Sequence, residues 1–148
     1  MVNDKIRSRP VPKTLPTCVL NSKKLLVIPK HALTNHELTR YAACLRIPFF
    51  RGVFMKDALP SKIWKNETGI VNLDNSDGPG THWVCYKKLK NKVYYFDSLG
   101  NLPPPQELLG YFSKAESVFY NFNRQQMPNT NICGHLCLEF LATSVSCL

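Results

Sequence analysis

The sequence predicts an α+β fold, in which a small, mostly antiparallel sheet packs against helices. The first observation is a pair of β-prone runs, His82–Leu89 and Lys92–Asp97, joined by a two-residue turn as in a hairpin. The second is a pair of helical signals: a capping box at the start of 34–45, and apolar residues at helical spacing from residue 131 onward. Because strands and helices follow one another in mixed order, the class is α+β.

The chain of 148 residues, 44% of them apolar, has the length and composition of one globular domain. Residues 1–16 are basic and contain three prolines, which predicts a flexible arm followed by a single domain over 17–148. No run approaches the roughly 18 apolar residues of a membrane span. Residues 1–13 lack the apolar stretch of a secretory signal, so we expect neither secretion nor a membrane partner.

Local signals define the elements before the hairpin. Lys24–Pro29 is apolar and predicts a short buried strand. Thr34 and Glu37 have the spacing of a capping box at a helix start, and Pro48 ends that helix. The segment 49–60 is apolar without a clear period, so its type stays open.

Turn residues and prolines organise the rest of the chain. Residues 72–80 are dense in Asn, Asp and Gly and predict a loop. Pro103–Pro105 open a helix that continues into QELLGYFSK. Residues 117–123 alternate and predict a strand, and the segment from 131 predicts the last helix.

A possible catalytic pair lies on the hairpin. His82 stands at the start of the first strand and Asp97 at the end of the second, and these two ends of a hairpin lie side by side. A carboxylate next to an imidazole orients the ring and stabilises its cationic form. The hairpin therefore predicts a His–Asp pair.

Cys133 stands at the start of the last helix, where free N–H groups and a partial positive charge favour a thiolate. A thiolate is the nucleophilic form of cysteine. Gly134 lets a substrate backbone approach closely. Gln126, seven residues before Cys133, can supply a side-chain N–H that binds an oxyanion together with the Cys133 backbone N–H.

The other cysteines and histidines are expected to have structural roles. The six cysteines are dispersed through a chain long enough to fold without disulfides, so free thiols are expected. Cys137 suits a packed, inert thiol, and His135 a partly buried neighbour of the site. Cys133, His135 and Cys137 are too close together on one helix to form a closed zinc site, so no metal is predicted.

The net charge of +9 permits a polyanionic partner, although no nucleic-acid motif accompanies it. A soluble basic protein without such a partner is the alternative. Four lysines cluster at the hairpin tip: Lys87, Lys88, Lys90 and Lys92. They suit either DNA binding or a solvated turn that protects the sheet from edge pairing.

Several motifs resemble a known family. GTHW at 80–83, YYFDSLG at 94–100, Gln126 and CGHLCLEFL at 133–141 resemble the adenovirus-type proteases, the adenains. More broadly they look like the papain-like clan that includes SUMO- and ubiquitin-like-protein proteases. Segment 49–60 and GIVNLDN look like relatives from Polinton/Maverick-type elements and related DNA viruses. The resemblance covers mainly residues 69–141.

By this resemblance, Cys133 is the nucleophile at a helix N-terminus, His82 the general base and later acid, and Asp97 its orienting partner. Gln126 forms the oxyanion hole, and Trp83 packs near the histidine. The family implies capsid or core precursors as substrates, and DNA and an activating peptide as possible cofactors, although the sequence itself requires none. It further implies a virion or host nucleus or cytoplasm as location. We expect a monomer.

Two other functions remain open. One is a deubiquitinase or deSUMOylase acting on ubiquitin-like proteins. The other is a non-catalytic basic module that binds DNA or capsid protein, which would require a broken His–Asp–Cys arrangement.

Overall fold

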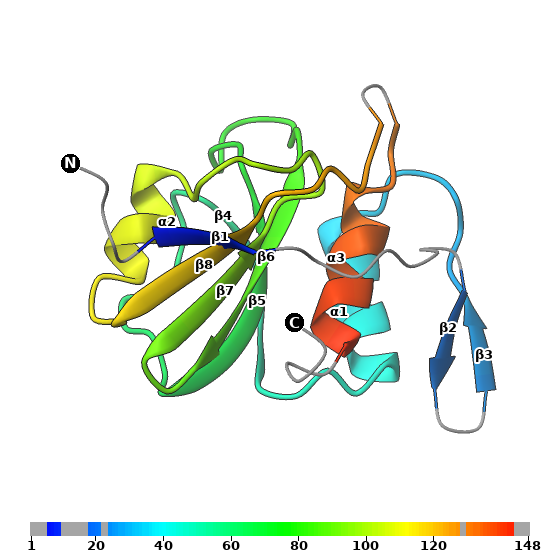
Figure 1. Cartoon of the computed structure of the whole chain (residues 1–148). Helices are drawn as coiled ribbons and strands as arrows, with labels where there is room; N and C mark the ends of the chain where they lie inside the picture. Colours follow the sequence, from blue (N-terminus) through cyan, green and yellow to red (C-terminus); the bar gives the residue numbers. More distant parts are fainter. Residues whose placement is uncertain (1–5, 10–17, 22–23, 128–129, 144–148) are drawn as a thin grey trace.

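The computed structural model describes residues 6–9, 18–21, 24–127 and 130–143, and centres on a six-stranded sheet with strand order β1-β8-β7-β6-β5-β4 (Figure 1). A separate pair, β2-β3, forms a second small sheet. In chain order the elements are β1 (Ile6–Arg9), β2 (Cys18–Asn21), β3 (Lys24–Val27), α1 (Asn35–Cys44), β4 (Phe50–Met55), β5 (Asn66–Asn72), β6 (Trp83–Leu89), β7 (Lys92–Phe96), α2 (Gln106–Tyr111), β8 (Ser117–Asn121) and α3 (Cys133–Ala142).

The main sheet is mixed, not mostly antiparallel as the sequence suggested. β5, β6 and β7 are antiparallel neighbours, and β6 and β7 form the predicted hairpin. The pairs β4–β5, β7–β8 and β1–β8 are parallel. The chain leaves β7, passes through α2 and returns as β8 alongside β7, a crossover that makes strands parallel. The α+β class itself is confirmed.

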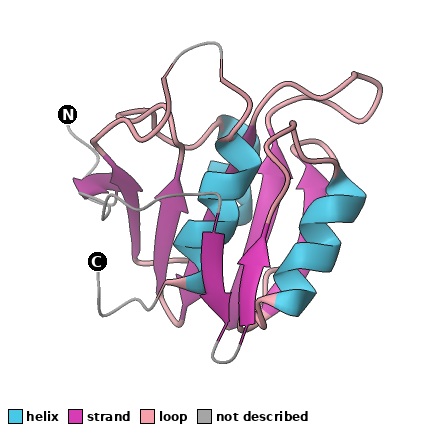
Figure 2. Cartoon of the chain, turned by 90° about the vertical axis from the view of Figure 1, so that its right-hand side faces the viewer, coloured by secondary structure: helices cyan, strands magenta, loops and turns pink. Residues whose placement is uncertain are grey.

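Helices cover both faces of the sheet. α1 and α3 lie together on one face and α2 lies on the other (Figure 1). Strand alternation supplies a core to each: on β6, Cys85 joins the core under α1 and α3, while Val84 and Tyr86 join the core under α2. Viewed from the side of α1 and α3, the β2–β3 pair lies in front of these helices (Figure 2).

Local predictions agree with the structure to different degrees. The capping box is confirmed: the Glu37 N–H donates to Thr34 Oγ1 and the Thr34 N–H donates to the Glu37 carboxylate. The predicted strand at 24–29 is β3 followed by the buried Ile28. The untyped segment 49–60 contains β4. The strand predicted at 117–123 ends at Asn121.

Within the predicted N-terminal arm, residues 6–9 form β1 against β8 in parallel register, with Ile6 opposite Val118. The rest of the arm, 1–5 and 10–16, lies outside the described residues. Within the described ranges, no helix is long and apolar enough to cross a membrane.

Candidate active site

A cleft of about 610 Å³ opens where several elements begin or end. Its walls come from the segments that open α1 and α3, from the ends of β4 and β5, and from the loop that enters β6. His82, Trp83, Gln126 and Cys133 all line it. Three of the four residues predicted to be catalytic therefore face one cavity.

The fourth, Asp97, lies behind His82. His82 Nε2 is 2.8 Å from Asp97 Oδ1, as the hairpin predicted. Asp97 is 1% exposed, and the same Oδ1 also accepts the Leu99 N–H at 3.0 Å. Because Asp97 occupies Nε2, the other ring nitrogen, Nδ1, is left to face the cleft.

The surroundings of His82 favour its cationic form. Burial alone would lower the pKa of the imidazole, but the hydrogen bonds to Asp97 and Cys133, and their negative charges, raise this pKa to about 9. At neutral pH the ring is therefore an imidazolium that lies between a carboxylate and a thiol.

Cys133 is the first residue of α3, and the preceding Ile132 makes no side-chain capping bond. Burial alone would raise the pKa of the thiol. Hydrogen bonds from His82 and from the backbone N–H groups of Trp83 and Gly134 outweigh burial and hold the pKa below its ordinary value. The helix start, the imidazolium and a neighbouring strand thus all stabilise a thiolate.

Gln126 is buried beside this pair, with its amide held at both ends. Its Oε1 accepts the Ser98 hydroxyl at 2.5 Å, and its Nε2 donates to the Thr130 carbonyl at 2.7 Å. A primary amide nitrogen carries two hydrogens. One hydrogen goes to Thr130, which leaves the second for a group in the cleft.

Trp83 and Gly134, the two predicted neighbours of the substrate, differ in their surroundings. Trp83 lines the cleft, and its indole Nε1 donates to the Leu33 carbonyl at 3.0 Å. Gly134 is buried, and a Cβ there would meet Leu33, Leu38 and Trp83 at 3.2–3.4 Å. The small size of Gly134 lets α3 pack against Leu33, α1 and Trp83, and its role beside the substrate stays a prediction.

Two polar residues that the sequence did not single out position the site. Asn121 is 1% exposed and clasps the backbone of Asp97: its Oδ1 accepts the Asp97 N–H at 2.8 Å and its Nδ2 donates to the Asp97 carbonyl at 2.6 Å. Ser98 holds the Gln126 amide, and its carbonyl also accepts the Gln126 N–H at 2.9 Å. Neither role has a local sequence signal, because each pair joins a residue before α2 to a residue after it.

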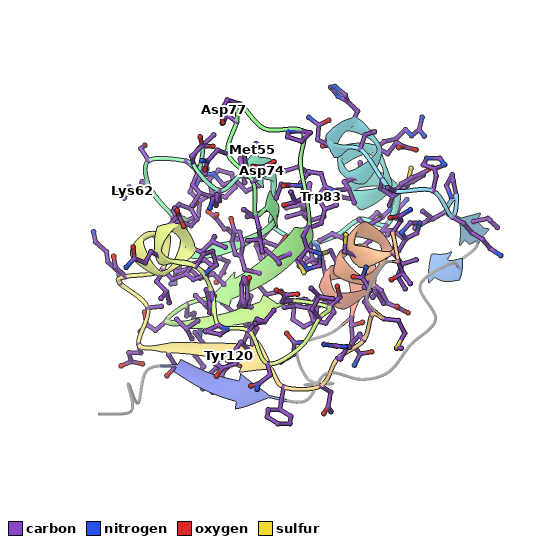
Figure 3. The ribbon with its side chains drawn as sticks, turned by 90° about the horizontal axis from the view of Figure 1, so that it is seen from above. Met55, Lys62, Asp74, Asp77, Trp83 and Tyr120 are labelled. Carbon is purple, nitrogen blue, oxygen red and sulfur yellow. The ribbon has the colours of Figure 1, made fainter. Side chains whose placement is uncertain are left out.

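The loop predicted at 72–80 is held in shape by its own side chains. Asn72 Oδ1 accepts the N–H groups of Asp74 and Thr81, and Asp74 Oδ2 accepts the Gly80 N–H at 3.0 Å. Seen from above, Asp74 lies beside Met55, and Trp83 lies toward α1 and α3 (Figure 3). This loop therefore delivers His82 to the cleft in a defined position.

The lysines at the hairpin tip do not form one exposed basic cluster. Lys87 is 3% exposed, and its ammonium donates to the Thr143 carbonyl near the end of α3. Lys88 is 7% exposed and donates to the carbonyls of Trp64 and Lys65. Lys87 and Lys88 are therefore bound within the fold, Lys90 and Lys92 are exposed, and DNA binding stays a prediction.

The other cysteine and histidine of α3 are internal. Cys137 is fully buried, which raises its thiol pKa well above the ordinary value. Cys85 Sγ lies 3.7 Å from the Cys137 carbonyl. His135 is fully rather than partly buried, and its Nε2 contacts the Pro29 carbonyl. The cleft is lined by neither Cys137 nor His135.

No family model and no curated protein sequence matches the chain. Among solved structures it is similar to the ASFV pS273R protease, with TM-score 0.52, 16% identity, and coverage of 77% of this chain and 57% of that one. A Se-Met form of that protease gives TM-score 0.44, 17% identity, and coverage of 77% and 58%. The SUMO protease Ulp1, its catalytic cysteine oxidised to a sulfonic acid, gives TM-score 0.35, 21% identity, and coverage of 72% and 49%.

At these identities the likeness to the ASFV pS273R protease establishes the fold. The predicted α+β fold is therefore shown, and it is similar to that of the ASFV pS273R protease, whereas a specific likeness to adenain is not shown. The chain spans between about half and three fifths of the length of the solved proteases that it matches.

Proposed function

We propose that the chain is a cysteine endopeptidase in which Cys133 is the nucleophile, His82 the general base and acid, Asp97 the orienting carboxylate and Gln126 an oxyanion donor. One observation carries the proposal. A thiol at an uncapped helix start, with a lowered pKa, shares a cleft with an imidazolium whose far nitrogen is 2.8 Å from a buried carboxylate. The fold of a viral protease supports it.

The geometry suits acyl transfer. The Cys133 thiolate attacks the scissile carbonyl carbon, and its electron pair forms a C–S bond while the carbonyl oxygen becomes negative. The His82 imidazolium then gives its proton to the leaving amine, and the C–N bond breaks to leave a thioester. Neutral His82 next takes a proton from water, which attacks the thioester and releases the carboxylic acid and the thiolate.

Two N–H groups are suited to hold the negative oxygen. The free hydrogen of Gln126 Nε2 is one, because Ser98 and Thr130 leave it unused. The backbone N–H of Cys133 is the other, because it belongs to the first turn of α3 and has no side-chain cap. Donors of this kind contribute about 2.7–4 kcal/mol each to the transition state.

The substrate is a separate proposal. The motifs at 80–83 and 133–141 favour processing of viral or mobile-element capsid or core precursors. Removal of ubiquitin-like proteins is the second candidate, since a SUMO protease is among the similar solved structures. Cleavage assays that compare a capsid-precursor peptide with ubiquitin and SUMO fusions separate the two. The intact His–Asp–Cys arrangement argues against a non-catalytic module.

The direct test replaces the nucleophile. Cys133→Ala should abolish peptide cleavage and leave the melting temperature within a few degrees of the wild type. Cys137→Ala is the matched control, since it removes a buried thiol one turn further along α3 and should retain cleavage. Mass spectrometry after brief iodoacetamide treatment should find Cys133 alkylated first. Cleavage by Cys133→Ala, or faster alkylation of another cysteine, would overturn the assignment.

A further inference from the structure

We propose that the open edge of β4 binds the substrate as an added strand, so that an extended, uncharged polypeptide segment pairs main chain to main chain with Val53 inside the cleft. The inference deepens the proposed function and rests on it. It assigns an interaction surface and a class of substrate segment to a strand that carries none of the four catalytic residues.

β4 is the last strand of the main sheet. Among the described residues it pairs with β5 and with no other strand. An edge strand presents a row of unpaired N–H and C=O groups, to which an extended peptide can add.

The register shows which groups face outward. The Lys56 N–H donates to the Asn72 carbonyl at 3.0 Å, while Met55 is the register partner of Asn72. In a parallel pair this pattern directs the main-chain groups of Phe54 and Lys56 toward β5 and those of Val53 and Met55 away from it.

The outward groups are largely unused. Within the described ranges, neither the N–H nor the C=O of Val53 has a hydrogen bond, and neither has the Met55 N–H; only the Met55 carbonyl is engaged, by the Ala58 N–H at 2.9 Å. A strand placed beside Val53 can therefore both donate to it and accept from it. The added strand can run parallel or antiparallel to β4. In both directions one N–H of the substrate donates to the Val53 carbonyl.

This edge is continuous with the catalytic cleft. Val53, Phe54 and Met55 line the same cavity as His82 and Cys133. Consecutive side chains of a strand point to opposite faces, so a cavity that touches three in a row runs along the edge of that strand. A chain segment that reaches Cys133 from this side must pass Val53.

The cleft is also uncharged apart from the reacting pair. Among the described residues its lining contains no Lys, Arg, Asp or Glu, although the whole chain carries a net charge of +9. Ion pairs therefore contribute little to recognition within the cavity. Main-chain pairing and contacts with apolar side chains such as Phe54 and Met55 remain as the source of affinity.

The first experiment uses N-methylated peptides and the wild-type chain. The probe is a ten-residue fluorogenic peptide, selected from a library of uncharged sequences by its cleavage. N-methylation of each amide in turn, other than the scissile one, should reveal one position at which kcat/KM falls about tenfold, since a hydrogen bond is lost and a methyl group blocks the edge. An N-methyl series with no sensitive position would overturn the inference.

The second experiment changes the strand. Val53→Pro removes the outward N–H and leaves the β4–β5 bonds in place, because proline is tolerated on an edge strand at such positions. It should lower kcat/KM about tenfold and shrink the penalty at the sensitive N-methyl position. Val53→Ala is the control that retains the N–H. Equal kcat/KM for the two folded variants would overturn the inference; if Val53→Pro does not fold, the N-methyl series decides.

Failure of this inference and failure of the proposed function have different signatures. Val53→Pro should retain the wild-type rate of Cys133 alkylation by iodoacetamide, because the thiolate does not depend on β4. If the wild type neither cleaves peptides nor alkylates first at Cys133, the proposed function fails. Strand addition is then decided by fluorescence anisotropy of fluorescein-labelled uncharged peptides and their N-methyl forms: weaker binding of one N-methyl form supports it, and uniform binding overturns it.

Discussion

Two buried carboxylates of the same sheet, Asp97 and Glu67, have opposite surroundings. Both are at most 1% exposed, and both interact with a basic side chain. Asp97 follows β7 and contacts His82, which lines the cleft. Glu67 lies in β5 and contacts Arg51, on the face of the sheet that α2 covers.

The two carboxylates differ in the groups that donate hydrogen bonds to them. Glu67 accepts from Arg51 and the Trp64 N–H at 2.9 Å, from the Tyr86 hydroxyl at 2.5 Å and from the Tyr111 hydroxyl at 2.6 Å. Burial alone would raise the pKa of Glu67, but these bonds hold it below the ordinary value. None of these donors lines the cleft, so the charge of Glu67 stabilises the fold and does not act on a group that substrate can reach.

Asp97, in contrast, affects the pKa values of groups in the cleft. Its charge raises the pKa of His82, and His82 in turn lowers the pKa of Cys133, which faces a cavity. A buried carboxylate is therefore no sign of catalysis by itself. The distinction is whether its partner also faces a group that substrate can reach.

The largest expected effect separates the two carboxylates by activity. Asp97→Asn should lower kcat by roughly a hundredfold to ten-thousandfold, because His82 loses its orientation and its stabilising charge. Glu67→Gln should leave kcat per folded molecule within about twofold. Active-site titration followed by peptide cleavage measures both. A similar loss of kcat in Asp97→Asn and Glu67→Gln would contradict the proposed difference between the two carboxylates.

The second effect is on stability, in the reverse order. Glu67→Gln should lower the free energy of unfolding by about 3 kcal/mol, because Arg51 loses its buried partner. Since the pKa of Glu67 is held below its ordinary 4.5, its contribution is present above that pH and is lost on acidification. Urea unfolding at pH 7 and pH 4 tests this. A stability difference between the wild type and Glu67→Gln that is the same at both pH values would contradict it.

The third effect concerns the oxyanion donor. Ser98→Ala should lower kcat roughly tenfold, because the Gln126 amide loses the bond that fixes its orientation. Alkylation of Cys133 by iodoacetamide forms no oxyanion and should keep its wild-type rate. Gln126→Ala sets the upper limit of the loss. A fall in both cleavage and alkylation would indicate general disruption of the site.

The smallest effect is the alkaline limb of the pH profile. His82 has its pKa raised to about 9, so cleavage should fall by about half at that pH as the imidazolium loses the proton it gives to the leaving amine. The stabilisation from this raised pKa is present below 6.5 and lost as pH rises toward 9. Asp97→Asn should move the limb to lower pH. Cleavage that still rises through pH 10 would exclude the assigned role.

Local and hairpin-scale features could be predicted from the sequence. Thr34 and Glu37 are three residues apart, so both residues of the capping box lie within one helical turn. His82 and Asp97 are brought together by a single hairpin, and Cys133 needs only the start of α3. These arrangements depend on short-range geometry.

What could not be predicted depends on distant contacts. β1 becomes a strand only because β8 is available beside it. Lys87 and Lys88 look like surface residues until the end of α3 and the segment before β5 provide carbonyls for their ammonium groups. Ser98 and Asn121 gain their roles from partners that are 24 to 28 residues away.

The parallel pairing of β1 with β8 has a consequence for the order of folding. It joins residues 6–9 to residues 118–121, a separation that makes loop closure slow compared with the β6–β7 hairpin. During synthesis β1 cannot pair until β8 has emerged, and Cys133 follows the end of β8, at Asn121, by 12 residues. Every described strand of the main sheet has therefore been synthesised before Cys133, the proposed nucleophile, is added.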